Sequence, residues 1–195
     1  LEKLGAIEVV VVDAGGEPAD GAVVTIGGPT IWPARAATTN DEGAVRIAGL
    51  RGGIYDLRAR LGNQVSPTEM GVRVERGETQ RLTLTLDVGR EIAIRVTDGP
   101  DPADGRLAPP VADAEVVVAE DGISTFPLQG RTGTDGEVVL GPVVEGRATV
   151  SVSADGFVPR TIAIGEEELE AGVAVVALSR GGGIIGRVED DRGYP

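Results

Sequence analysis

The stretch PADGAVVTI at residues 18–26 occurs a second time, in altered form, as PVADAEVVV at residues 110–118. The two copies are 92 residues apart (110 − 18). GAVRI at residues 43–47 is related to GEVVL at residues 136–140 by nearly the same spacing, 93 residues (136 − 43). Several markers that keep one spacing predict a structural unit of about ninety residues that is used twice.

The end of the chain repeats its middle once more. Leu86 and Leu178 close the two units at a spacing of 92 (178 − 86), and IIGRVEDDRGYP at 184–195 then resembles IAIRVTD at 92–98. The predicted organisation is repeat one at 1–87, repeat two at 88–179, and the first strand of a truncated third repeat at 180–195. A stretch rich in Pro, Gly and Asp at 99–109 reads as a surface loop inserted into repeat two.

The local pattern is that of β-strands. In residues 80–86 leucines alternate with polar residues, which is the period of a half-buried strand, and turn residues recur at short intervals along the chain. Around the apolar Ala59, the arginines Arg58 and Arg60 are expected to face outward. No helical period is convincing, and Glu166–Glu170 is interpreted as a loop. The predicted fold is therefore all-β, with tandem Greek-key sandwiches of about seven strands each.

The inventory of side chains excludes most catalytic chemistry. The chain has no Cys and no His, so Ser-His-Asp and Cys-His sites and thiolate metal sites cannot be built. Lys3 is its one lysine and lies at the extreme N-terminus. Carboxylates are plentiful, but nothing in the sequence marks a pair in a cleft. We therefore predict that the protein is not an enzyme and needs no cofactor.

The charge balance also narrows the range of partners. A formal net charge of −13 disfavours binding to nucleic acid and to anionic membranes. No apolar run approaches the ~20 residues of a membrane span, and no signal peptide is evident. Because the sequence begins at Leu1 rather than at Met, we expect it to be a piece of a longer polypeptide.

Four short motifs, in order, resemble the carboxypeptidase regulatory-like domain family, whose β-sandwiches are prealbumin-like and similar to Cna-B-like repeats. The first is Val-x-Asp-x-x-Gly-x-Pro-x-x-Gly-Ala-x-Val at 11–24, and the second is the Thr-Asp-x-x-Gly type of turn at 39–43 and 134–136. The third is a Gly-Leu-x-x-Gly-x-Tyr corner at 49–55, and the fourth is ADGFVP at 154–159. Repeat two has Ala148 in place of the corner Tyr55.

This resemblance implies a function that the composition alone does not give. Relatives of this type are accessory or structural modules, so we expect a non-catalytic stalk, spacer or assembly module of a larger bacterial protein. The resemblance also implies an extracytoplasmic location: periplasm, cell surface or secreted. Expected partners are further repeats of the same polypeptide or other envelope proteins. Two alternatives stay open, namely a carbohydrate- or calcium-dependent adhesive module and an accessory domain of an enzyme on the same polypeptide.

The hallmark residues themselves are expected to be structural. Gly43, Gly136 and Gly156 suit turns that require a positive φ. Asp41 and Asp135 are expected to accept hydrogen bonds from turn amides. The aromatic residues listed next are expected to anchor the sandwiches: Tyr55, Phe157.

Candidate ligand sites are few. Asp98, Asp101, Asp104 and Asp190 lie near the predicted repeat junctions, where calcium could bridge carboxylates, but no Asp-x-Asp-x-Asp-Gly series accompanies them. Solvated turn carboxylates are the favoured interpretation. Trp32 lies in a segment, 27–33, that reads as a loop. Its packing over the sandwich end is favoured over docking to a sugar or a protein partner.

The last segment raises the question of strand exchange. Its apolar residues Ile184, Ile185 and Val188 would need a sheet to join. They are expected to begin the next repeat of an array, or else to add to a neighbouring molecule and form a homo-oligomer. The third alternative is that they add to the edge of repeat two.

Overall fold

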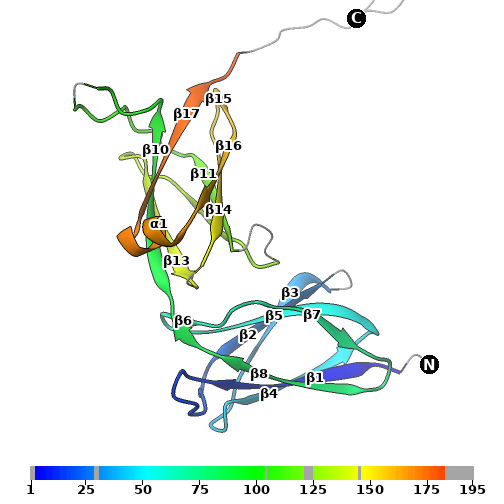
Figure 1. The fold of residues 1–195 in the computed structure, drawn as a ribbon. Helices are drawn as coiled ribbons and strands as arrows, with labels where there is room; N and C mark the ends of the chain where they lie inside the picture. Colours follow the sequence, from blue (N-terminus) through cyan, green and yellow to red (C-terminus); the bar gives the residue numbers. More distant parts are fainter. Residues whose placement is uncertain (1–2, 29–30, 104, 121–124, 145, 183–195) are drawn as a thin grey trace, which may run out of the picture.

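The computed structural model describes residues 3–28, 31–103, 105–120, 125–144 and 146–182. Within these ranges nearly all regular structure is β, which confirms the predicted fold class. The chain forms two sandwiches, called here sandwich one (β1–β9) and sandwich two (β10–β17) (Figure 1). Ile184, Ile185, Val188 and Asp190, together with Asp104, lie outside the described residues. The repeat limits at 87 and 179 stay a prediction.

Sandwich one packs a three-stranded sheet, β4-β1-β8, against a larger sheet, β3-β2-β5-β6-β9, in which β7 also pairs with β5. Its strands have the following bounds: β1 Gly5–Val12, β2 Val23–Gly28, β3 Ile31–Thr38, β4 Ala44–Leu50, β5 Gly53–Leu61, β6 Gln64–Val65, β7 Glu69–Val74, β8 Thr79–Thr85 and β9 Asp87–Val88. The alternation expected for the last long strand holds, because Leu84 is buried between exposed threonines.

Sandwich two packs the sheet β13-β10-β17-β15 against the sheet β12-β11-β14-β16. Its elements have the following bounds: β10 Arg90–Asp98, β11 Glu115–Glu120, β12 Leu128–Arg131, β13 Glu137–Val143, β14 Ala148–Ser153, β15 Phe157–Val158, β16 Arg160–Ile164, α1 Glu166–Ala171 and β17 Val173–Arg180. In both sandwiches the first and last long strands are parallel neighbours: β1 pairs with β8, and β10 pairs with β17.

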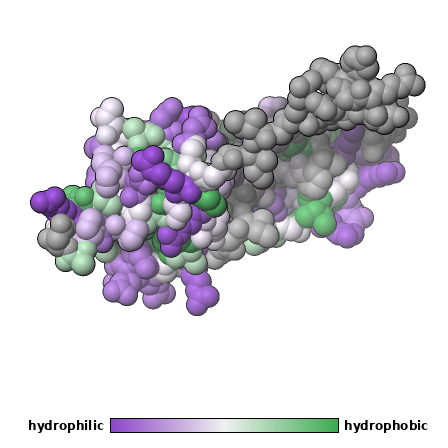
Figure 2. Space-filling model, turned by 90° about the horizontal axis from the view of Figure 1, so that it is seen from above, coloured by the Kyte–Doolittle hydropathy of each residue, from purple (hydrophilic) through white to green (hydrophobic). Residues whose placement is uncertain are grey.

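Each sandwich has its own hydrophobic core. The first includes Ile7, Ile26 and Leu57, and the second includes Ile92, Val150 and Leu178. All six of these side chains are fully buried. The cores are built of Val, Ile, Leu and Ala, as the low aromatic content of 3% requires. In the view of Figure 2 hydrophilic and hydrophobic residues are interspersed on the coloured surface.

The helix α1 corrects the prediction of a loop at 166–170. The Glu168 carboxylate accepts a hydrogen bond from the Gly165 amide at 2.9 Å, which closes the first turn. This bond holds the pKa of Glu168 below its ordinary value. Leu169 is buried, and Gly172 ends the helix in the left-handed conformation at φ 67°. A single apolar side chain and two good caps therefore suffice for a helix too short to show a period.

The turn chemistry is mostly as expected, with two corrections. Gly43 and Gly136 have φ of 68° and 75°, as the turns require. Asp135 accepts a hydrogen bond from the Glu137 amide, but in sandwich one it is Asn40, rather than Asp41, that accepts bonds from turn amides. A side-chain oxygen at either neighbouring position can reach the same backbone, and for this reason the motif alone chose the wrong residue.

The threonine that binds the turn also lies at a different position in sandwich two from the one that the motif predicts. Thr39 Oγ1 accepts a bond from the Ala22 amide and donates to the Ala19 carbonyl. In sandwich two the same pair of bonds is made by Thr132, with Ala114 and Val111. Thr134, the residue singled out by the sequence motif, is exposed.

Candidate functional site

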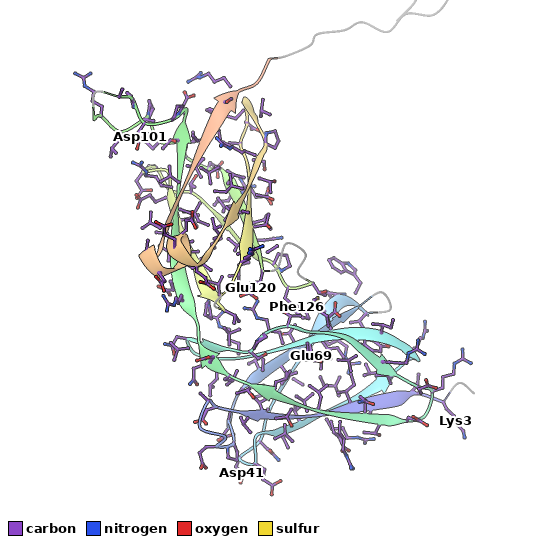
Figure 3. The ribbon with its side chains drawn as sticks, viewed as in Figure 1. Lys3, Asp41, Glu69, Asp101, Glu120 and Phe126 are labelled. Atoms are coloured by element: carbon purple, nitrogen blue, oxygen red, sulfur yellow. The ribbon has the colours of Figure 1, made fainter. Side chains whose placement is uncertain are left out.

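The junction between the sandwiches is the first candidate site. Sandwich two stands end-on upon the outer face of the larger sheet of sandwich one, so the two are not collinear as a simple rod of repeats would be (Figure 1). Figure 3 shows Glu120 and Phe126 where the sandwiches meet and Asp101 at the opposite end of sandwich two. The junction is defined here by the following residues: Gly27, Asp56, Arg58, Val65 and Gly89 on one side, Glu120, Thr125, Phe126, Pro142 and Val144 on the other.

The centre of the junction is a buried ion pair. Arg58 NH2 lies 3.0 Å from Glu120 Oε1, with the two side chains only 9% and 13% exposed. Arg58 also donates to the Pro142 carbonyl at 3.3 Å, and the Val144 amide donates to Glu120 at 2.7 Å. Burial of both charges is costly unless each has several partners. Glu120 Oε1 accepts two bonds and Arg58 NH2 donates two, whereas the buried Nε of Arg58 has no hydrogen-bond partner among the described residues.

The burial of Arg58 corrects an expectation. Strand alternation does place Arg58 on the outer face of its sheet, opposite the core residues Leu57 and Ala59. The residue is nevertheless only 8% exposed, because sandwich two covers that face. Arg60, two residues along the same strand, stays exposed as expected. Periodicity shows which face a residue occupies but carries no information about what covers the face.

Apolar contacts and a second polar contact surround the ion pair. Asp56 accepts hydrogen bonds from the Gly71 amide at 2.9 Å and from the Thr125 hydroxyl across the junction. A side chain at Gly27 would meet Thr125 at 2.7 Å and Phe126 at 3.1 Å. Gly89, which connects β9 to β10, is packed as closely against its neighbours: a Cβ there would lie 2.3 Å from Pro142 and 2.9 Å from Val65. Both glycines thus allow backbone and side chains to approach closely.

The corner that contains Tyr55 in sandwich one is built differently in sandwich two, where it faces the junction. In sandwich one the Tyr55 hydroxyl donates to the Arg51 carbonyl at 2.7 Å, and the ring is buried as expected of an anchor. Ala148 stands at this position in sandwich two. There the Val144 amide is bound by Glu120 instead. Phe157 is partly buried against the core of sandwich two and lies 5.7 Å from the Arg180 guanidinium.

The turns and the corner of sandwich one lie at the motif positions of a known family. The family model of the carboxypeptidase regulatory-like domain matches residues 6–87. Residues 6–87 belong to this family. In this carboxypeptidase regulatory-like domain, the motif residues Gly43, Thr39 and Tyr55 act in the turn and the corner, as described above.

Comparison with solved structures adds general likeness only. The Bacillus anthracis TIE protein is 22% identical over 91% of this chain and 34% of its own, with a TM-score of 0.39. The minor pilin GBS52 of Streptococcus agalactiae is 12% identical, covering 94% of this chain and 99% of its own, with a TM-score of 0.40. The shaft pilin SpaA of Lactobacillus rhamnosus GG is 10% identical, covering 95% and 100%, with a TM-score of 0.35. The chain spans about a third of the Bacillus protein. No curated protein matches the chain.

The candidate calcium ligands are held by arginines. Asp98 binds Arg180 through Nε at 2.9 Å and NH2 at 2.5 Å. Asp101 binds Arg95 at 2.7 Å and accepts the Ala108 amide at 2.8 Å. The Ala108 bond first, and then Arg95, hold the pKa of Asp101 below its ordinary value. The described residues contain no cluster of three or more potential metal ligands. A calcium site at these positions stays a prediction.

Trp32 is the second candidate site, and here the favoured interpretation is wrong. The side chain is 95% exposed and does not pack over the sandwich. It lies near the start of β3 rather than in a loop. Trp32 lines a groove of about 470 Å³ together with the neighbouring residues Ile31, Pro33, Ala34 and Arg35. Gly49, Leu50, Arg51 and Tyr55 line the rest. These residues with Trp32 are called the Trp32 end, and its role in binding stays a prediction.

Proposed function

We propose that the chain is a non-catalytic structural module that holds two β-sandwiches at a fixed angle within a larger polypeptide. The observation that carries the proposal is the junction of Arg58 with Glu120. Side chains that merely tether two domains stay solvated, whereas these two are buried and make three polar contacts, one with each other and two with the backbone. Such a joint fixes orientation, which is the property needed in a spacer or an assembly module.

The proposal includes a place for this module outside the cytoplasm, on the cell surface or in a secreted protein of bacteria, as the family resemblance implies. The described part of the chain contains no helix with the length and apolarity needed to cross a bilayer. Calcium-dependent adhesion has less support, because Asp98 and Asp101 are already bound to guanidinium groups.

The test is a distance distribution across the junction. The chain has no Cys, so spin labels can be placed cleanly at Glu42→Cys in sandwich one and Asp155→Cys in sandwich two. Pulsed electron paramagnetic resonance of this pair should give one narrow distribution. The substitution Arg58→Gln should broaden it, because a buried Glu120 without its cation costs about 2–5 kcal/mol. Arg60→Gln, on the same strand but exposed, is the matched control and should leave it narrow.

Two outcomes contradict the proposal. A broad distribution in the unsubstituted protein would show that the sandwiches are loosely tethered. A distribution that stays narrow in Arg58→Gln would show that the ion pair does not fix the angle.

A further inference from the structure

The end of sandwich two that contacts sandwich one has a counterpart in sandwich one, and this counterpart does not contact sandwich two in the described structure. Thr39 and Thr132 make the same hydrogen bonds, and Trp32 and Thr125 each precede them by seven residues (39 − 32 and 132 − 125). By this count Trp32 holds the sequence position of Thr125, and Pro33 that of Phe126, although the first two lie within β3 and the second two precede β12.

The second half of this end corresponds as well. Gly43 and Gly136 each accept a hydrogen bond from the first strand of their sandwich, from Val11 and Val96. Gly49 follows Gly43 by the same number of residues as the junction residue Pro142 follows Gly136 (49 − 43 and 142 − 136). In the same way Arg51 corresponds to the junction residue Val144. The Trp32 end is thus the same surface of the fold that sandwich two uses for docking, with an exposed indole at its rim.

The receiving surface also has a counterpart, on sandwich two. In sandwich one Thr25 pairs with Arg58 and Gly27 with Asp56. In sandwich two the corresponding strands are β11 and β14. There the pair Val117 and Ser151 corresponds to Thr25 and Arg58, and the pair Ala119 and Thr149 corresponds to Gly27 and Asp56. Part of the outer face of this sheet, here called the platform, comprises the following residues: Val117, Ala119, Thr149, Ser151, Thr161 and Ala163. The same face continues into Glu115, Gln129, Arg131 and Ser153, which lie outside the platform.

The platform suits a flat aromatic side chain. Its side chains are all small and uncharged, and all are partly or fully exposed. Ala119 takes the place of Gly27, the residue on which Phe126 rests within the junction. Ser151 and Thr161 share a hydrogen bond of 3.0 Å, so an apolar ring that covers them would leave one hydroxyl donor to be satisfied rather than two. In sandwich one the corresponding charged pair, Asp56 and Arg58, needs polar partners instead.

We propose that the Trp32 end of one molecule docks on the platform of a second copy, head to tail. This contact repeats between molecules the end-on-face arrangement that the two sandwiches make within the chain. The two surfaces are different, so each copy keeps one of each free and the association continues into open chains rather than closing as a dimer. A tryptophan that is exposed in the free protein and becomes buried on docking is the type of residue that dominates such a contact.

The test uses sedimentation velocity over a concentration series with Trp32→Ala and Thr161→Arg. The unsubstituted protein should associate with rising concentration, and each variant should weaken association at least about tenfold. An equimolar mixture of the two variants should form one-to-one pairs that go no further, because each supplies the surface the other lacks. Leu107→Ala and Thr83→Arg, at exposed positions away from both surfaces, are the matched controls and should behave like the unsubstituted protein.

Fluorescence gives an independent readout, since Trp32 is the one tryptophan of the sequence. Its emission should shift to the blue as the unsubstituted protein associates, and should not shift in Thr161→Arg. Three results overturn the proposal: an unsubstituted protein that stays monomeric throughout, a Thr161→Arg variant that still associates, or a mixture of variants that does not pair. Ala163→Arg should repeat the result of Thr161→Arg, which guards against a local folding defect.

Discussion

The two sandwiches close the same corner in different ways. In sandwich one the Tyr55 hydroxyl binds the Arg51 carbonyl, so the corner is complete within the sandwich. In sandwich two Ala148 offers no hydroxyl, and the corner amide of Val144 is bound by Glu120, which in turn pairs with Arg58 across the junction. The two corners thus use different bonds, and in sandwich two the carboxylate that accepts from the corner amide also pairs with sandwich one.

A second difference lies on the outer face of the smaller sheet. In sandwich one a charged row crosses the sheet, in which Glu8 pairs in register with Arg46 and Arg81. In sandwich two the row at the corresponding strands is apolar, with Ala93 between Val139 and Val173. One fold thus tolerates opposite surfaces, because outward positions contribute little to the core that defines it.

The largest expected effect comes from breaking the closed corner. Tyr55→Ala removes a fully buried ring and should destabilise sandwich one by about 3–5 kcal/mol, whereas Tyr55→Phe, which loses only the hydroxyl bond, should cost about 1 kcal/mol. Hydrogen-exchange mass spectrometry resolves the two sandwiches separately. Faster exchange should be concentrated in peptides from 5–85. Equal acceleration in peptides of sandwich two would show that the sandwiches unfold as one unit.

A smaller effect is expected from the charged row. Arg81 donates to the Glu8 carboxylate at 2.8 Å, and this bond holds the pKa of Glu8 below its ordinary value. A carboxyl whose folded pKa is depressed stabilises the protein above its unfolded pKa, and this stabilisation is lost as pH falls through the folded value. Glu8→Gln should therefore lower the Tm slightly at pH 7, and the difference should vanish in acid.

Thermal scans from pH 7 down to pH 3 measure this difference, with Glu42→Gln at an exposed turn as the control. A Tm difference that persists unchanged to pH 3 would mean that Glu8 acts through packing instead of charge. High salt at pH 7 should shrink the difference as well.

The smallest effect is expected when the charged row of sandwich one is introduced into sandwich two. The triple substitution Val139→Arg, Ala93→Glu and Val173→Arg should change the stability of sandwich two by no more than about 0.5 kcal/mol per position. Chemical denaturation measures it. A loss of several kcal/mol would show that the apolar row contributes to stability in a way that the charged row does not.

The framework of the fold could be predicted from the sequence, because it depends on local chemistry. Alternating apolar residues, turn glycines such as Gly43 and Gly136, and the corner Tyr55 all act within a few residues or one sandwich. The turn acceptor was assigned to Asp41 instead of Asn40 because neighbouring oxygens can serve one turn.

The sites were harder to predict, because they depend on what lies across from a residue. Arg58 reads as an ordinary outward arginine until sandwich two covers it. Trp32 reads as a residue that should find apolar cover, yet at the start of β3 no part of the described structure covers its side chain. The pairing of Arg58 with Glu120 joins residues 62 positions apart in different sandwiches, and no local pattern marks it.

The parallel pairing of the first and last long strands determines how a sandwich would carry load. The chain enters sandwich one at the start of β1 and leaves it beyond the end of β8, and the two strands are in register from Ala6 with Thr79 to Val12 with Thr85. Tension along the polypeptide therefore pulls these strands past each other lengthwise. Their hydrogen bonds are strained together in shear and cannot open one at a time like a zipper, and the same geometry recurs between β10 and β17.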